Sequence, residues 1–241
     1  MRLQGTIVLS TLLCCFLATA VIEAMPPMQN TDRYQVVRAE KDFRINELDN
    51  PQWQTARAVL IDRYWSGETA PMSRHFIVRM LWTRRSLYMK CEATQQEPLV
   101  VSLTPKTESK AMGLWGRDVC ELFIAPIREL PEKYFEFEVA PNGEWLDLAI
   151  DVTSGTRVTD WDFASGMLAA ARVDEGSVTM AFKVDFKAFD KTPRPGEIWL
   201  GNFFRAVGRD PDRGYLAWRP TMTPKPDFHV PSKFGEIEFL R

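Results

Sequence analysis

The sequence has little histidine and no excess of charge of either sign. Its 241 residues include 2 histidines, and 30 Lys and Arg stand against 32 Asp and Glu, for a formal net charge of -2. Nucleic acids and anionic membrane surfaces favour basic clusters, so we expect neither as a partner. Glycine-rich phosphate loops, zinc-ligand spacings and a Gly-x-Ser-x-Gly turn are also missing. We therefore expect no enzymatic activity.

Long apolar runs are absent except near the amino terminus. There, an apolar run from Thr6 to Val21 follows a positively charged start, and small residues such as Ala20 and Ala24 suit a cleavage site. The run is short for a membrane span, so we interpret residues 1–24 as a secretory signal peptide rather than an uncleaved anchor. The mature protein is then expected to be secreted, periplasmic or extracellular, with no stable membrane insertion.

Cysteine is scarce as well. Of the four cysteines, Cys14 and Cys15 would leave with the signal peptide, and Cys91 and Cys120 would remain. Two cysteines in an oxidising compartment favour one disulfide. Both fall on the apolar faces of expected strands, where they could face each other. The alternative is a pair of buried free thiols, which behave as small hydrophobic side chains.

Helical periodicity is thin, and short strands separated by turns dominate. Single helical turns are expected near 50–58, with Asn50 as N-cap, and at 185–189. We predict an all-β antiparallel β-sandwich of jelly-roll or immunoglobulin-like type with few short helices. Residues 25–34 are expected to be a flexible lead-in and 35–241 a single domain. Strands are expected at 76–82, 87–93, 119–125, 134–139, 145–150, 167–173, 178–184, 197–207 and 236–240.

The stretch GLWGRDVCELFIAP, residues 113–126, places a carboxylate inside an apolar strand. Because side chains alternate along a strand, Cys120 and Leu122 share one face while Glu121 and Phe123 share the other. If the cysteine face is core, Glu121 lies on an outer face. The alternative to a ligand contact is a salt bridge within the sheet, and Arg205, in an otherwise apolar strand, could hold Glu121 or Glu138 in place.

The strand expected at 134–139 has the same two faces. Its alternation puts Glu136 and Glu138 with Tyr134 on the outer face. A face that mixes carboxylates with aromatic rings suits a sugar, which presents hydroxyls at the ring edge and C–H groups on the ring face. The spacing of the two glutamates also fits a glycosidase pair, but such pairs are common on solvated strands.

Several segments from residue 115 onward occur in an order and at spacings that match a known family. They are Trp115–Phe123, Tyr134–Gly143, Val178–Val184 with Phe186, Gly201–Ala206, Leu216–Pro220 and Phe228–Ile237. From the first to the last, their order and spacing span most of residues 40–241. The ordered set resembles the carbohydrate-binding module family 9-like domains, within the wider DOMON-like β-sandwich group.

The resemblance implies a jelly-roll-like sandwich that holds a sugar ring between two tryptophans, with carboxylate, amide and arginine groups at the rim. Trp115, six residues before Glu121, matches the family's first tryptophan, and Trp218 is the best candidate for the second. Trp161, like Trp145 and Trp199, is expected to pack in the core or at an edge. The further candidate contacts are Arg117, Asn142, Arg205 and His229.

The resemblance also implies structural calcium, while the stretch from Thr104 to Leu114 has few acidic residues, where a calcium loop needs several oxygen ligands. The sequence leaves this cofactor open. The expected partner is a saccharide or glycan, with an enzyme encoded elsewhere as a second one.

Two alternative functions stay open from the sequence alone. One is a non-covalent haem-binding electron-transfer domain, for which Met80, Met89, Met112, Met222 and His229 are candidate ligands. The other is an envelope protein-interaction module that uses a sandwich face.

Overall fold

The computed structural model describes residues 32–241, so the expected signal peptide and most of the lead-in lie outside the described residues. Within this range the chain forms thirteen strands and five short 3-10 helices, without an α-helix. The first strand begins at Arg33, two residues inside the expected lead-in, and Tyr34 is fully buried. No helix in residues 32–241 is long and apolar enough to span a membrane.

The strands are β1 (Arg33–Arg38), β2 (Ala58–Ile61), β3 (Phe76–Trp82), β4 (Ser86–Thr94), β5 (Val119–Ala125), β6 (Lys133–Val139), β7 (Trp145–Asp151), β8 (Val158–Asp160), β9 (Leu168–Asp174), β10 (Ser177–Asp185), β11 (Ile198–Val207), β12 (Gly214–Ala217) and β13 (Gly235–Phe239). The 3-10 helices are η1 (Pro51–Thr55), η2 (Met72–Arg74), η3 (Leu114–Gly116), η4 (Phe186–Phe189) and η5 (Pro231–Lys233). The expected turns near 50–58 and 185–189 correspond to η1 and η4, and Asn50 caps η1 by accepting a hydrogen bond from the Gln52 amide.

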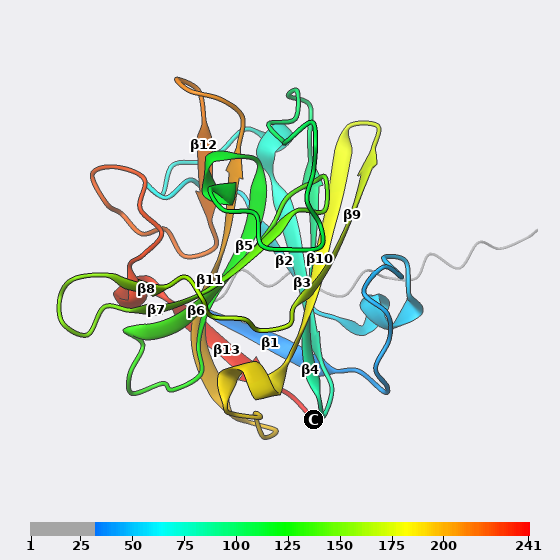
Figure 1. Ribbon diagram of the computed structural model, residues 1–241, viewed down its shortest axis with the longest axis vertical. Helices are drawn as coiled ribbons and strands as arrows, with labels where there is room; N and C mark the ends of the chain where they lie inside the picture. Colours follow the sequence, from blue (N-terminus) through cyan, green and yellow to red (C-terminus); the bar gives the residue numbers. More distant parts are fainter. Residues whose placement is uncertain (1–31) are drawn as a thin grey trace, which may run out of the picture.

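One curled sheet contains all thirteen strands. Its order is β8-β7-β6-β5-β11-β13-β1-β3-β4-β10-β9, with β12 beside β11 and β2 beside β3. The sheet folds into two layers, with β6, β7 and β8 at one side of the molecule and β4, β10 and β9 at the other (Figure 1). We call β5, β6, β7, β8, β11, β12 and β13 the first layer. We call β2, β3, β4, β9 and β10 the second layer.

Strand β1 joins the two layers. It pairs in parallel with both β13 and β3, whereas all the other pairs of strands are antiparallel. The predicted all-β sandwich is confirmed, with the addition that its pairing is mixed at this one strand. The first strand of the chain therefore lies beside the last one in the sheet.

An inner core fills the space between the layers. Large aromatic side chains dominate it, among them Trp199, Phe137 and Phe182. The expected disulfide is present: Cys91 on β4 and Cys120 on β5 connect the layers through this core, with their Cα atoms 6.7 Å apart. The core therefore accounts for one face of β5, the face that sequence alternation assigned to it.

The outer faces of both layers are covered too. On the first layer, Phe123 and Phe204 form an outer cluster, and Phe228 and Phe234 from the loop before β13 pack on it. On the second layer, the segment before β2 covers β4, where Phe43 stacks on Tyr88 with ring centroids 4.4 Å apart. As a result all seven residues of β5 are buried, Glu121 included.

Candidate functional site

Trp115 stands on a rigid loop at the edge of the first layer. The loop turns at Gly113, whose φ of 79° lies in the left-handed region that glycine adopts without strain. The Arg213 guanidinium donates hydrogen bonds to the carbonyl oxygens of Trp115 and Gly116, each at 3.0 Å. These hydrogen bonds hold the backbone of the loop, while Trp115 itself stays 48% exposed.

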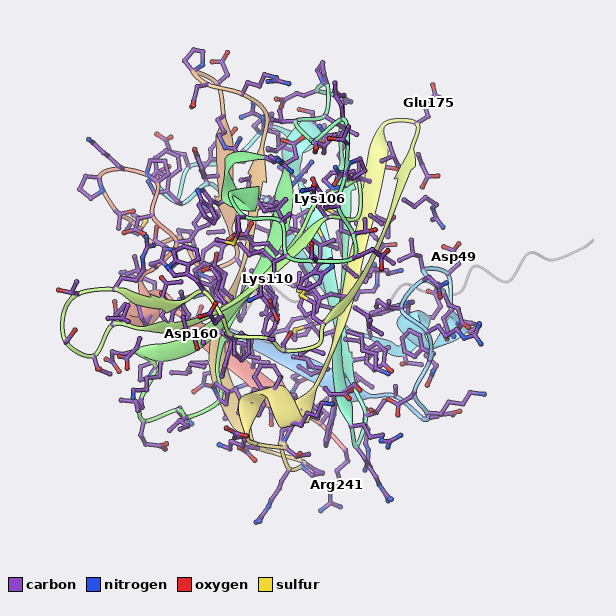
Figure 2. All side chains as sticks on the ribbon, viewed as in Figure 1. Asp49, Lys106, Lys110, Asp160, Glu175 and Arg241 are labelled. Carbon is purple, nitrogen blue, oxygen red and sulfur yellow. A yellow bond between two sulfur atoms is a disulfide. The ribbon has the colours of Figure 1, made fainter. Side chains whose placement is uncertain are left out.

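A second tryptophan lies beside it. Trp161 is 49% exposed, and its ring centroid is 6.0 Å from that of Trp115, with the two planes tilted by 48°. Asp160 fixes the turn by accepting hydrogen bonds from the amides of Asp162 and Phe163, and Lys110 donates to the Trp161 carbonyl at 3.3 Å. In Figure 2, Lys110 is labelled near the middle of the view and Asp160 below and to the left of it.

Two adjoining cavities, of about 180 and about 280 Å³, lie under these indoles. Together they fall within the size range of small-molecule sites. We call them the Trp115 cleft. Both are lined by Trp115, Glu136, Arg157 and His229; the first adds Leu148, Ile150, Thr159 and Trp161, and the second adds Glu121, Phe123, Ala206, Tyr215, Pro226, Asp227 and Phe228.

Carboxylates form the floor of the cleft. Glu121 and Glu136 line it, and Glu138 lies next to them, directly opposite Glu121 in the β5–β6 pairing. All three are buried. Burial raises the pKa of Glu121 and of Glu138 well above the ordinary value, and the charge of neighbouring carboxylates adds to the increase. The pKa of Glu136 is also raised by burial.

Two nitrogen-bearing side chains complete the wall. The Nδ1 atom of His229 lies 2.8 Å from the Tyr134 hydroxyl, at hydrogen-bonding distance, and its Nε2 atom lies 3.9 Å from Glu136 Oε2. Burial lowers the pKa of His229 to about 4, so the ring is neutral near pH 7 and its contact with Glu136 is not an ion pair. Arg157 is exposed and has no hydrogen bond or ion pair within residues 32–241. Its guanidinium is available to a ligand.

Two of the expected polar contacts lie elsewhere. Arg117 forms an ion pair with Glu144, and the Asn142 amide donates to the same carboxylate at 3.0 Å and to the Ser102 carbonyl at 3.2 Å. Neither residue lines the Trp115 cleft. They stabilise the loop that leads to Trp115 and the turn between β6 and β7.

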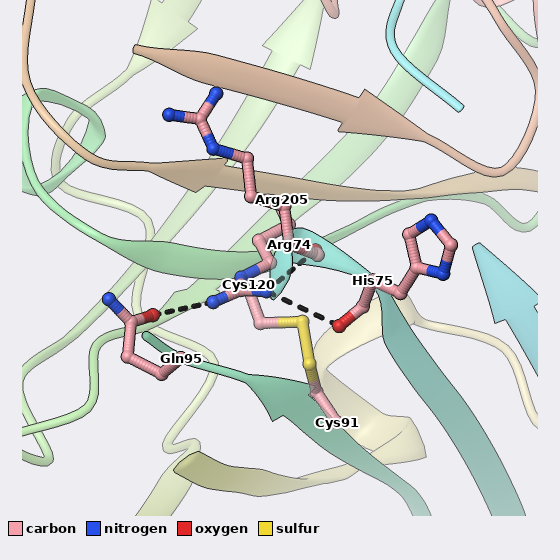
Figure 3. Close-up of a disulfide and its surroundings, with 6 residues drawn as sticks. All are labelled: Arg74, His75, Cys91, Gln95, Cys120 and Arg205. Carbon is pink, nitrogen blue, oxygen red and sulfur yellow. Dashed lines mark hydrogen bonds between the residues drawn. A yellow bond between two sulfur atoms is a disulfide. The ribbon is translucent and has the colours of Figure 1, made fainter. Parts of the chain in front are cut away.

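Arg205 lies on the opposite face of the sheet from Glu121. It pairs with Cys120 on β5, whereas its neighbour Phe204 pairs with Glu121. Its guanidinium donates to the Arg74 carbonyl at 2.7 Å and to Gln95 Oε1 at 2.6 Å, beside the disulfide (Figure 3). The expectation that Arg205 holds Glu121 or Glu138 is wrong, because one step along a strand exchanges the faces.

Trp218 belongs to the inner core. It is 8% exposed and packs against Phe203 and Tyr34, with ring centroids 5.2 and 6.5 Å away. The structure does not bring it next to Trp115, so it offers no second stacking plane there. Met80 and Met89 are also in the inner core and do not line the cleft.

Of the residues named from the sequence, Trp115, Glu121 and His229 come together in one cleft. Trp161 and Arg157 complete it and were not expected. Trp161 stands between Asp160 and Asp162, and this polar setting is the signal that indicates an exposed indole. Arg157 lies in a loop with no periodicity, so the sequence gives no comparable signal for it.

Comparison with known proteins links residues 102–239 to the model of carbohydrate-binding family 9. The chain is also 25% identical over 190 residues to a protein of Arthroderma benhamiae named "Extracellular protein", and the match covers 72% of this chain and 83% of the relative.

Among solved structures, a proposed carbohydrate-binding protein from Bacteroides uniformis is similar at a TM-score of 0.69 and 16% identity, covering 86% of this chain and 98% of that one. A carbohydrate binding module family 9 from Caldicellulosiruptor kristjanssonii is similar in its complex with cellotriose, at a TM-score of 0.62, 15% identity and coverage of 86% and 93%. Its complex with glucose is similar at a TM-score of 0.61 and 16% identity, covering 87% of this chain and 96% of that one. At these identities the likeness shows a shared fold.

Proposed function

The chain belongs to carbohydrate-binding family 9, whose model covers more than half of it, and we propose that it is a secreted, non-catalytic protein that binds a saccharide in the Trp115 cleft. The observation that carries the proposal is the pair of half-exposed indoles above a cleft with a carboxylate floor. Two adjacent exposed indoles form a contiguous apolar patch, and such patches mark interaction or ligand-binding sites.

The two indoles would act as an angled platform. A ring held between two parallel indoles needs about 7–8 Å between them, since each face-to-face contact takes about 3.5–4.0 Å. The centroids of Trp115 and Trp161 are 6.0 Å apart, which is too close for a ring to enter between them. We therefore place the C–H face of the sugar on the platform and one ring edge toward the floor.

Polar groups of the cleft would bind the hydroxyls at that edge. Arg157 offers up to five N–H donors, and the Glu121 and Glu136 carboxyl groups offer acceptors. Low solvent access strengthens such hydrogen bonds and makes an unmatched hydroxyl costly, which favours one orientation of the ring.

The comparisons support a choice of ligands to test and the proposal that the protein is secreted. Cellotriose and glucose, the sugars in the Caldicellulosiruptor complexes, are the first probes for this chain. Secretion is supported by the relative named as extracellular and by the disulfide, which oxidising compartments favour. The chain would then target a glycan alone or beside an enzyme encoded elsewhere.

The test is a glycan array followed by calorimetric titration with cellotriose and with the best array ligand. Trp115→Ala and Trp161→Ala are expected to weaken binding at least about tenfold, which corresponds to about 1.4 kcal/mol. Leu168→Ala is the matched control, because it removes an exposed apolar side chain from the edge strand β9. The proposal fails if no glycan binds, or if neither tryptophan substitution changes the affinity.

A further inference from the structure

Three carboxylates meet below the cleft. Glu121 on β5 pairs with Glu138 on β6, and Glu136 lies two residues along β6 on the same face. One carboxylate oxygen from each lies within 4.8 Å of the other two. The arrangement comes from strand register, so the backbone positions of the three glutamates cannot separate without breaking the β5–β6 pairing.

The carboxylate at the back of this cluster accepts no hydrogen bond from an N–H or hydroxyl group of the described residues. Glu138 is 0% exposed, and within residues 32–241 neither of its oxygens accepts a hydrogen bond. Glu136 Oε2 is buried without a partner as well. A buried carboxylate with no such donor is very costly, so a proton shared with Glu136 or a bound cation must compensate for it.

The surrounding side chains cannot provide that compensation. Across the sheet, Phe204 pairs with Glu121, Leu146 with Glu138, and Phe123 and Leu148 with Glu136. All of these neighbours are apolar and buried, so they bring no donor to the carboxylates.

The nearest cations do not neutralise the cluster either. Arg213 donates its hydrogen bonds to backbone carbonyls, including those of Trp115 and Gly208, at 3.0 and 3.1 Å. Arg157 is exposed on the wall of the cleft and forms no ion pair with any carboxylate within the described residues. A cation from outside the protein chain is therefore the partner that would take the place of the shared proton.

We propose that Glu121, Glu136 and Glu138 bind a divalent metal ion, and that Ca²⁺ fits them better than Mg²⁺. A ligand set made only of carboxylate oxygens selects hard cations. Two oxygens on one ion are separated by at most twice the metal–oxygen distance, about 4.6–5.2 Å for Ca²⁺ and about 4.0–4.2 Å for Mg²⁺. Oxygens that lie within 4.8 Å of one another can share one ion. Mg²⁺ keeps several of its waters and is seldom bound by protein oxygens alone, so three buried carboxylates suit Ca²⁺ better.

This site is formed by strands β5 and β6 and not by the acid-poor stretch 104–114. It is a proposal additional to the binding of a saccharide. Glu121 and Glu136 belong to both, so a bound ion would fix the floor of the Trp115 cleft. Ion binding can be measured without any sugar. Failure of one proposal is therefore distinguishable from failure of the other.

The experiment titrates the chelator-stripped protein with CaCl₂ by calorimetry and follows thermal unfolding with CaCl₂, with MgCl₂ and with EDTA. We expect one Ca²⁺ per chain and a midpoint about 5–10 °C higher when free Ca²⁺ exceeds the dissociation constant a hundredfold. Mg²⁺ at the same concentration is expected to give a smaller shift. No heat of binding and no shift with either ion would overturn the proposal.

Variants locate the ion. Glu138→Gln keeps the shape of the side chain and removes the charge, so it is expected to abolish the calcium-dependent shift; Glu136→Gln tests the same point if Glu138→Gln does not fold. Glu175→Gln is the matched control, because Glu175 projects from the β9–β10 hairpin tip (Figure 2). A calcium shift that persists unchanged in Glu138→Gln and Glu136→Gln would place the ion elsewhere and overturn the assignment.

Discussion

Buried carboxylates in this protein have two different kinds of surroundings. Glu144 accepts hydrogen bonds from the Asn142 amide at 3.0 Å and the Lys106 backbone amide at 3.1 Å, and it forms an ion pair with Arg117. Glu138 has none of these. Burial alone would raise the pKa of Glu144, but its hydrogen bonds outweigh that effect and hold the pKa below the ordinary value.

A carboxylate with a lowered pKa makes stability depend on pH. In the unfolded chain Glu144 takes up a proton near a pKa of about 4.3, and in the folded protein its pKa is lower. The stabilising effect of Glu144 is therefore complete above the unfolded pKa, and it is lost as the pH falls through the folded pKa. Glu144→Gln is expected to reduce the free energy of unfolding by about 2 kcal/mol at pH 7 and by less at about pH 3.5.

Urea unfolding of the wild type and the variant at both pH values measures this difference. Glu175→Gln, an exposed glutamate, serves as control and should leave the free energy nearly unchanged at both. An equal loss in Glu144→Gln at pH 7 and in acid would show that the pKa of Glu144 is not lowered.

The faces of single residues could be predicted where alternation is strict. Cys120 and Glu121 lie on the faces that the sequence assigned to them. Arg205 was misassigned because its strand is apolar on both faces, so no alternation reveals which side it takes. Its charge is accommodated by carbonyl and amide oxygens, and although burial lowers its pKa to about 10, it stays protonated at neutral pH.

At the scale of elements, the loop that carries Trp115 depends on one backbone conformation. Gly113 has a φ of 79°, and a Cβ added there would meet no atom within 4 Å. A substitution at this position therefore tests backbone strain alone. Gly116, three residues on, is equally open but has no positive φ, which makes it a matched control.

Gly113→Ala is expected to destabilise the loop by about 1 kcal/mol, because alanine is strained in the left-handed region. Since the loop presents Trp115, saccharide affinity should fall severalfold, while Gly116→Ala should leave it nearly unchanged. Calorimetric titration with the ligand identified on the glycan array measures both. Equal affinities of the two variants would mean that the turn does not position the indole.

Every strand expected from the sequence is present, and each of their ends lies within one residue of the expected position. The unexpected strands are β1, β2, β8 and β12. Three of them have only three or four residues, too few for alternation to be visible. The fourth, β1, gains its hydrogen bonds from β13 and β3, and pairing partners so distant in the chain leave no local pattern.

At the scale of the whole molecule, the loop that covers the outer face of the first layer turns this face into a cleft. Strand alternation left Glu121 on a face of unknown exposure. The cover comes from Phe228 and His229, more than a hundred residues later, in a loop without periodicity. Local patterns cannot report such a contact, which is why the sequence yielded Trp115, Glu121 and His229 and missed Trp161 as their neighbour.

The disulfide also acts at the scale of the whole molecule, because it connects the two layers. Cys91 and Cys120 are 29 residues apart and join the two layers, so the bond limits how far the unfolded layers separate. The loop-entropy model gives about 3–4 kcal/mol for a loop of this length. Reduction of the wild type should lower the free energy of unfolding by about this amount, and Cys91→Ala/Cys120→Ala should show a similar loss that reductant does not change. Urea unfolding with and without dithiothreitol tests it, and a wild type equally stable in both would leave the layers held by their packed core alone.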